Sequence, residues 1–263
     1  MSPDVALEAS PLAPPRTAKR PFWAAFPDEE LLDLRLCDLR LQVAGSRLAP
    51  LLARLDRDFA SKGIARFRPY AWFSTGWFTP HGTTGFAIPF YLAHPRLLRL
   101  ERHLIGDAEG GSVASCMRLL RHEAAHALDH AYRLHRRGSW REQFGPFSRP
   151  YHATYRPRLG HRGFVVNLGH GYAQSHPAED WAETFAVWLA PTSRWRMQYQ
   201  GWPALRKLCY VDALVREIRN LPPAVRTRER VDPLDEKRVT LREHYARKSA
   251  RLGRARLRGE FLR

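Results

Sequence analysis

The stretch Arg121-His122-Glu123-Ala124-Ala125-His126-Ala127 decides the fold, because it contains the pattern HExxH. On a helix, His122 and His126 lie four residues apart on one face, so both imidazoles can bind one metal ion. Glu123 lies beside them, where its carboxylate can accept a proton from a metal-bound water. The stretch therefore predicts a helix that supplies two zinc ligands and a general base.

The helix around this motif is expected to begin after the N-cap Ser112, to run to about Arg136 and to end at Gly138. One apolar stripe supports it: Cys116, Leu120, Ala124, Ala127, Ala131 and Leu134. His130 continues the four-residue spacing. A straight helix cannot wrap three such residues around one ion, so we expect a structural role for His130. A metzincin would have a third histidine at position 132, where this sequence has Tyr132.

The third ligand is expected in the segment YAQSHPAEDWAETFA, at residues 172–186. Pro177 begins a helix there and Pro191 ends it. Glu179 and Glu183 are four residues apart on one face of this helix. One carboxylate can bind the metal, and the other can accept the free N–H of a ligand histidine.

Two other residues of this segment compete with Glu179 for the third ligand position, namely His176 and Asp180. Beside an HExxH motif we favour Glu179 over both. His176 is also a candidate proton donor, although a histidine at this position can simply cap the helix.

HExxH followed by the 172–186 segment resembles the bacterial zinc-binding metallopeptidases of the gluzincin type. More distantly it is similar to the catalytic domain of anthrax lethal factor, where a Tyr precedes an ExxAE helix. The stretches GFAIPFYLAHPRLLRLE (85–101) and GWPALRKLCYVD (201–212) resemble the same bacterial group. The resemblance covers roughly residues 30–215 and is most specific over 119–189.

The resemblance implies a zincin-like fold and a set of site residues. These are His122, His126 and Glu179 as zinc ligands, Glu123 as general base, Glu183 as the carboxylate behind a ligand histidine, and Tyr172 as a donor to the developing oxyanion. The sequence departs from the thermolysin-like pattern NExxxD, because Ala178 stands in place of Asn and Glu183 in place of Asp.

The remaining segments favour an α+β class: a small mixed sheet packed on the HExxH helix, with a helical subdomain after it. Strands are expected at 67–74 and 85–92, and residues 87–91 form either an edge strand that pairs with substrate or a plain core strand. Alternating Leu and Arg residues over 34–43 predict another strand, although a helix from Asp28 competes.

Helices are also expected at 47–61 and from Pro203 to Asn220. Residues 138–171 are expected to form a long connection with one short strand at 163–168. The expected organisation is a disordered Pro/Ala-rich tail over 1–20, a metallopeptidase domain over 21–222 and a basic C-terminal extension over 223–263.

The chain is strongly basic, with 43 Lys and Arg against 26 Asp and Glu and a formal net charge of +17. Residues 223–263 carry 13 Lys and Arg against 6 Asp and Glu. Such a tail suits nucleic acid or another acidic partner, and a solvated Arg-rich helix is the alternative.

Composition excludes several classes of protein. A hydrophobic fraction of 44% excludes a wholly disordered chain, and no apolar run is long enough for a transmembrane helix. The N-terminal residues lack the pattern of a secretory signal, so none is expected. Cys37, Cys116 and Cys209 are far apart, which predicts neither disulfides nor a cysteine-built zinc site and favours the cytoplasm.

The sequence therefore predicts a metallopeptidase that uses Zn²⁺ to hydrolyse peptide bonds in a protein or peptide substrate. Two alternatives remain open. One is a basic protein that binds nucleic acid or another polyanion and keeps a structural zinc. The other is a zinc hydrolase of a non-peptide amide.

Overall fold

A computed structural model describes residues 20–152, 155–169 and 171–258, with side chains up to residue 253. The described chain is α+β and mostly helical. Its α-helices are α1 (Asp28–Leu32), α2 (Ala49–Ser61), α3 (Pro95–Ile105), α4 (Val113–Tyr132), α5 (Gly138–Phe144), α6 (Pro177–Leu189), α7 (Trp195–Gln198), α8 (Leu205–Ile218) and α9 (Leu241–Arg258). Shorter 3₁₀ helices are η1 (Phe22–Ala25), η2 (Leu36–Leu39), η3 (Phe90–Ala93), η4 (Leu134–Arg136), η5 (Tyr172–Gln174) and η6 (Leu234–Glu236). The expected tail over 1–20 lies, apart from Arg20, outside the described residues.

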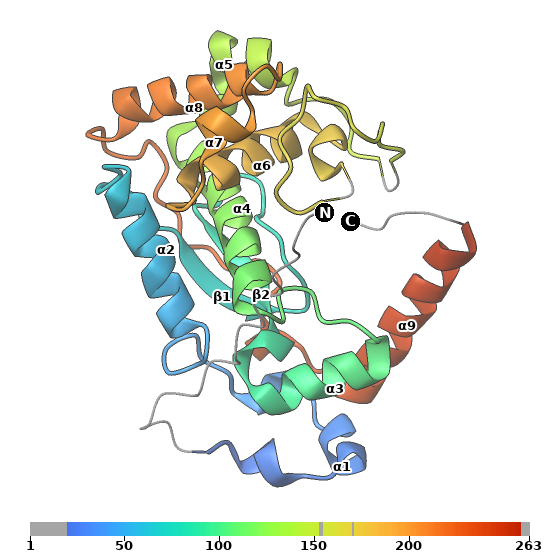
Figure 1. The fold of residues 1–263 in the computed structure, drawn as a ribbon. Helices are drawn as coiled ribbons and strands as arrows, with labels where there is room; N and C mark the ends of the chain where they lie inside the picture. The colour runs from blue at the N-terminus through green and yellow to red at the C-terminus, as the bar shows by residue number, and fades with distance from the viewer. Residues whose placement is uncertain (1–19, 153–154, 170, 259–263) are drawn as a thin grey trace.

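The helix α4 carries the HExxH motif through the middle of the molecule (Figure 1). Ser112 caps it as expected, because its side chain accepts a hydrogen bond from the main-chain N–H of Ser115. The expected end near Arg136 is wrong, since α4 stops at Tyr132. Arg133 adopts a left-handed backbone conformation with φ 52°, which breaks the helix before η4 begins.

The helix α6 packs against α4 and brings the second half of the candidate site to the first (Figure 1). Pro177 is its first residue, and the side chain of His176 accepts a hydrogen bond from the main-chain N–H of Ala178. The indole N–H of Trp181 donates to the carbonyl oxygen of Ala125 at 2.9 Å. Because Ala125 has a small side chain, the two helices approach closely enough for this bond.

The sheet has two parallel strands, β1 (Tyr70–Ser74) and β2 (Gly85–Pro89), so the expected mixed sheet is wrong among the described residues. One antiparallel bridge, between Phe78 and Ala87, covers the other side of β2. All five residues of β2 are buried, which fits the alternative of a core strand, while pairing with a substrate stays a prediction.

Two strand predictions are wrong because other groups bind the main chain there. Within 34–43 the chain forms η2, and its main-chain contacts go to residues 237–241. A helix does start at Asp28, as the alternative proposed. Residues 163–168 form no strand, since the main-chain N–H groups of Asn167 and Leu168 donate to the Glu183 carboxylate instead.

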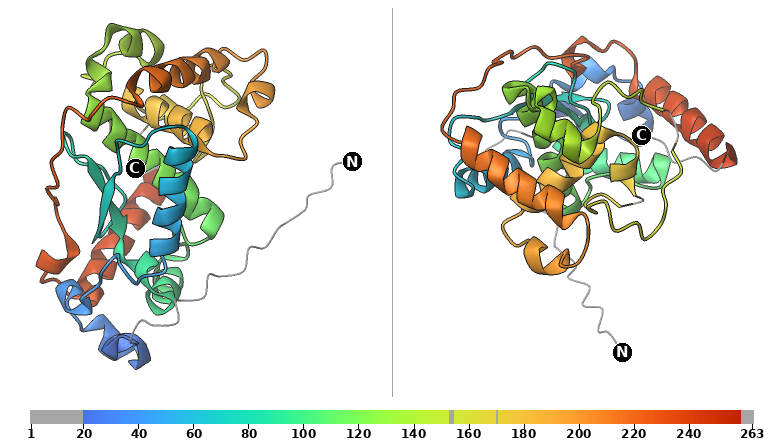
Figure 2. Two further views of the ribbon diagram at one scale, coloured as in Figure 1. Left: turned by 90° about the vertical axis from the view of Figure 1, so that its left-hand side faces the viewer. Right: turned by 90° about the horizontal axis from the view of Figure 1, so that it is seen from above.

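Part of the segment 223–263 packs on the rest of the chain. Leu241 and Tyr245 of α9 belong to the main hydrophobic core, and Lys248 pairs with the buried Glu101 of α3. Figures 1 and 2 show α9 beside α3, at the end of the molecule that also holds α1. None of the described helices has the length and apolar character needed to cross a membrane.

Candidate metal centre

Two helices bring together three side chains that can hold a metal ion. His122 and His126 lie on one face of α4, and Glu179 lies in the first turn of α6. The atoms of these three residues that could bind a metal all lie within 4.8 Å of one another. We call His122, His126 and Glu179 the ligand group. His122 and Glu179 are buried, while the side chain of His126 is 12% exposed. Glu179, which the sequence favours as third ligand, thus lies beside the two histidines in a group that could hold a metal ion.

The distances between these atoms fit a small tetrahedral ion. Glu179 Oε2 lies 3.0 Å from His122 Nε2 and 3.3 Å from His126 Nε2, and the two Nε2 atoms are 3.2 Å apart. In a tetrahedral zinc site with bonds of about 2.0–2.1 Å, neighbouring ligand atoms are about 3.3–3.4 Å apart. The three donors therefore need little rearrangement to surround zinc.

Glu183 lies behind His122, on the side away from the other two donors. Its Oε1 is 2.9 Å from His122 Nδ1, so Glu183 orients the imidazole while Nε2 faces the metal position. Asn167 donates to the same carboxylate through its main-chain N–H at 2.9 Å and its side-chain amide at 3.1 Å. The main-chain N–H of Leu168 adds a bond at 2.8 Å. Among these contacts only the pairing with histidine was predicted.

The carboxylates of Glu179 and Glu183 stabilise a positive charge at His122. Burial disfavours a charged imidazole, but the bonds to Glu179 and Glu183 outweigh burial and raise the pKa of His122 to about 10. Despite its own burial, Glu179 is kept ionised, because the two histidines hold its pKa well below the usual range. A proton or a metal cation can each balance the negative charge of these carboxylates, and the two compete for the same donor atoms.

Glu123 is buried beside the ligand histidines and is oriented by a residue that the sequence did not reveal. Thr79 Oγ1 donates to Glu123 Oε2 at 2.8 Å and lies 3.2 Å from the carbonyl oxygen of Glu123. Burial raises the pKa of the Glu123 carboxyl, which makes its carboxylate a better proton acceptor. Thr79 lies in the connection between β1 and β2, where no sequence pattern marks it.

Tyr172 lies on η5, just before α6, and its ring centre is 5.6 Å from that of His122. This places an aromatic residue next to the ligand group, as the resemblance implied. A second tyrosine, which the sequence analysis missed, contacts a ligand directly: the hydroxyl of Tyr151 donates to Glu179 Oε1 at 3.0 Å. That bond leaves Glu179 Oε2 directed at the histidines.

The two alternative ligands point elsewhere. His176 caps α6 through Nδ1, its Nε2 lies 2.7 Å from the Arg149 carbonyl oxygen, and its ring stacks on Tyr151 with centres 3.6 Å apart. This confirms the capping alternative, and its role as proton donor stays a prediction. Asp180 pairs with Lys207 at 2.6 Å. Neither residue belongs to the ligand group.

His130 also lies outside the ligand group, although it continues the spacing of the two ligand histidines. Its Nδ1 lies 3.2 Å from the carbonyl oxygen of Thr83, and burial lowers the pKa of its imidazole to about 3. A neutral, buried imidazole bonded to the chain before β2 fits the structural role expected for it.

The chain was compared with known proteins in three ways. No protein-family model matches it, and no curated protein and no solved structure is significantly similar to it. The resemblance to gluzincins therefore rests on the motifs in the sequence, and the side-chain geometry is independent of it.

Proposed function

We propose that this protein is a zinc-dependent metallopeptidase that hydrolyses peptide bonds. The observation that carries the proposal is the convergence of two imidazole nitrogens and one carboxylate oxygen, 3.0–3.3 Å apart, beside the buried Glu123. His122, His126 and Glu179 would hold the ion. Zinc bound there supplies a Lewis acid that lowers the pKa of water and polarises a carbonyl group.

The residues around the ion would divide the remaining work. Glu123 would accept the proton of the attacking water and later return it to the leaving amine. Thr79 keeps the Glu123 carboxylate in one orientation through its bond at 2.8 Å. Tyr172 would donate to the oxyanion as it develops, and its place beside His122 supports this role.

The number of protein ligands favours catalysis over a structural zinc. Structural zinc sites hold the ion with four protein ligands, whereas catalytic sites use three and leave one position open. Within the described ranges, the ligand group contains three residues. This supports the enzyme over the alternative of a polyanion-binding protein with a structural zinc.

Replacing Glu123 by glutamine tests the proposal. Glu123→Gln should bind one zinc per chain and keep the unfolding temperature of the wild type, yet lose peptide cleavage by at least about a hundredfold. Zinc is measured by elemental analysis, and cleavage by mass spectrometry on a peptide library. The matched control is Glu142→Gln, an exposed acid on α5, which should cleave like the wild type.

Three outcomes would count against the proposal. A wild type that takes up no zinc at micromolar concentrations would remove its basis. Cleavage that survives in Glu123→Gln would remove the general base. A zinc-loaded wild type that cleaves no peptide but hydrolyses small non-peptide amides would favour the hydrolase alternative.

A further inference from the structure

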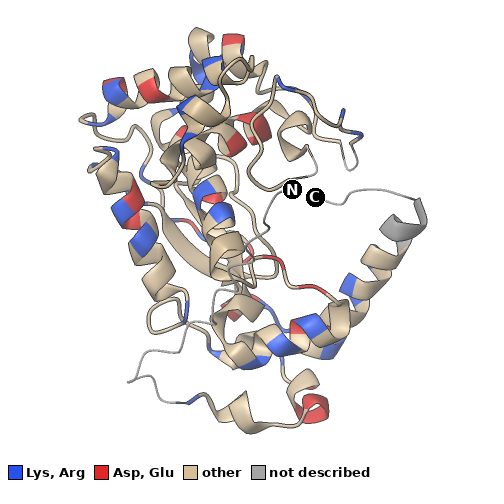
Figure 3. Ribbon diagram, viewed as in Figure 1, with Lys and Arg blue, Asp and Glu red and all other residues tan. Residues whose placement is uncertain are grey.

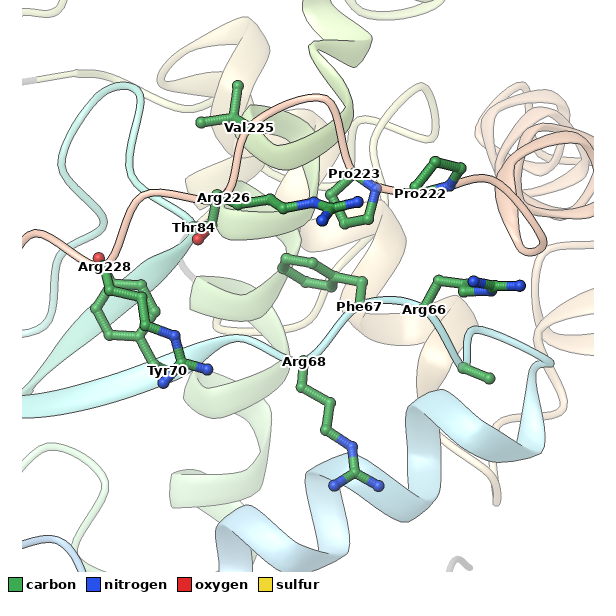
Figure 4. Close-up of a pocket in the computed structure, with 11 residues that line it drawn as sticks. Arg66, Phe67, Arg68, Tyr70, Thr84, Pro222, Pro223, Val225, Arg226 and Arg228 are labelled. Atoms are coloured by element: carbon green, nitrogen blue, oxygen red, sulfur yellow. The ribbon is translucent and has the colours of Figure 1, made fainter.

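A hollow of about 460 Å³ lies away from the metal centre, between residues 65–70 and residues 222–228 (Figure 4). Its lining includes four arginines: Arg66, Arg68, Arg226 and Arg228. All four are exposed and their side chains point in different directions, so they form no convergent site. Polar groups do converge at the metal centre, where a neighbouring segment reaches one member of the ligand group.

This segment belongs to residues 145–171, which connect α5 to η5, and it reaches Glu179 through Tyr151. The hydroxyl of Tyr151 donates to Glu179 Oε1 at 3.0 Å. The other carboxylate oxygen, Oε2, lies 3.0 Å from His122 Nε2 and 3.3 Å from His126 Nε2. The two oxygens of Glu179 thus have different partners, since one faces the histidines and the other accepts from a tyrosine.

A single imidazole holds Tyr151 in this orientation. The ring of His176 stacks on that of Tyr151, with centres 3.6 Å apart and planes 16° apart. His176 is buried and fixed at both nitrogens, because Nδ1 accepts from the main-chain N–H of Ala178 at 3.1 Å and Nε2 donates to the carbonyl oxygen of Arg149 at 2.7 Å. The same imidazole therefore joins residues 149–151 to the first turn of α6, which carries Glu179.

The donor to Oε1 is uncharged, although charged donors are close in the sequence. Figure 3 shows basic residues on the 145–171 connection, all of them arginines, and acidic residues on α6. Within the described ranges, Glu179 forms ion pairs only with His122 and His126. A guanidinium group can bind both oxygens of a carboxylate at once, whereas a phenol hydroxyl donates a single hydrogen bond. Tyr151 therefore occupies one oxygen and leaves the other for a metal.

The use of a single oxygen bears on the open position of the centre. Carboxylates bind metal ions through one oxygen or through both. Three ligands that each supply one atom leave the fourth position of a tetrahedral ion open, as a catalytic zinc site requires. If Glu179 bound through both oxygens, Oε1 would crowd that position. To do so, Oε1 would have to give up the hydrogen bond from Tyr151, and hydrogen bonds to ionised groups are the strong ones.

We propose that Tyr151 is a positioning residue that keeps Glu179 a one-oxygen ligand and thereby keeps the fourth metal position open. The inference rests on the proposed function and deepens it. It also gives the segment 149–151 a role, because this segment and His176 together hold the phenol against the ligand. Tyr151 acts through Glu179 and needs no contact with the substrate.

Replacing Tyr151 by phenylalanine tests the proposal in protein loaded with Co²⁺. Four-coordinate Co²⁺ absorbs visible light more strongly than five-coordinate Co²⁺. Tyr151→Phe should still bind one cobalt per chain, but its absorption per cobalt should fall about twofold or more, because the freed Oε1 joins the ion. The side chain keeps its stack on His176 and is 53% exposed, so the unfolding temperature should stay that of the wild type.

The matched control is Tyr210→Phe on α8, which removes a hydroxyl that lies 3.2 Å from Ser139 Oγ, outside the ligand group. This control should give the wild-type spectrum. A wild-type spectrum in Tyr151→Phe would overturn the proposal, and it would do so even if a chelator then removed zinc more easily, since Tyr151 would only orient Glu179. A wild type that takes up no cobalt would overturn the proposed function as well, whereas an unchanged spectrum leaves that function standing.

Discussion

Replacement of Glu183 by glutamine probes how the second helix supports the metal centre. Glu183 Oε1 lies 2.9 Å from His122 Nδ1 and 3.1 Å from the side-chain amide of Asn167. Oε2 accepts from the main-chain N–H groups of Asn167 and Leu168 at 2.9 and 2.8 Å. Glutamine has the same shape, but one of its terminal atoms is an amide nitrogen that cannot accept. In either orientation, two donors lose their acceptor.

The size of the effect follows from these contacts. A hydrogen bond to a charged group contributes about 1.5–3 kcal/mol, so the loss of two should lower the free energy of unfolding by about 3–6 kcal/mol. Loss of the acid behind a ligand histidine typically lowers metal affinity by about 10–100-fold. Urea denaturation measures the first quantity, and competition with a chelator measures zinc affinity.

The matched control is Asp180→Asn, in the same helix. Asp180 is also buried, but it pairs with Lys207 at 2.6 Å and takes no part in the ligand group. The control should lose stability through the buried Lys207 and change zinc affinity by no more than about twofold. If Glu183→Gln binds zinc as tightly as the wild type, or if both variants weaken zinc equally, the assigned role of Glu183 is wrong.

Three further substitutions test other parts of the structure. Asp58→Asn breaks the buried pair with Arg121, so urea denaturation should show a loss of about 3–5 kcal/mol while zinc still binds one per chain. Thr79→Val removes the hydroxyl that orients Glu123, so kcat for peptide cleavage should fall about tenfold with zinc content unchanged, and an unaltered kcat would contradict this role. Burial lowers the pKa of His244 to about 4, so between pH 6.5 and 4 the unfolded chain binds more protons than the folded one. Folded-state stability should therefore fall by about 2 kcal/mol from pH 7 to pH 5 on account of His244. His244→Asn should remove that part of the loss in urea titrations, and an unchanged pH dependence would refute it.

The two helices of the candidate site could be predicted from the sequence because their signals are local. HExxH fixes the spacing of two side chains on one helical face, and this spacing needs no knowledge of the rest of the fold. Ser112 and Pro177 mark where the two helices begin, and both act in the structure as expected. The approach of Glu179 to His122 and His126 rested on pattern, and the structure brings these three residues together.

Predictions failed where distant groups bind the main chain. The segment 163–168 has the composition of a strand, yet the N–H of Val166 donates to the Tyr199 hydroxyl, and those of the next two residues donate to Glu183. Over 34–43 the alternation of Leu and Arg suits a strand, but the partners available at 237–241 form only one antiparallel bridge with it. Periodicity identifies which side chains are apolar, and it does not identify what satisfies the backbone.

The departure from the NExxxD pattern has a physical explanation in the same contacts. Glu179 and Glu183, one turn apart on α6, lie on opposite nitrogens of a single imidazole, with Oε2 of the first 3.0 Å from Nε2 and Oε1 of the second 2.9 Å from Nδ1. The carboxylate of Glu183 also accepts hydrogen bonds from the main-chain N–H groups of residues 167 and 168. An aspartate, shorter by one methylene, would have to give up one of these two sets of bonds unless α6 moved towards α4. The contact of Trp181 with Ala125 fixes that separation, so the longer acid follows from how the helices pack.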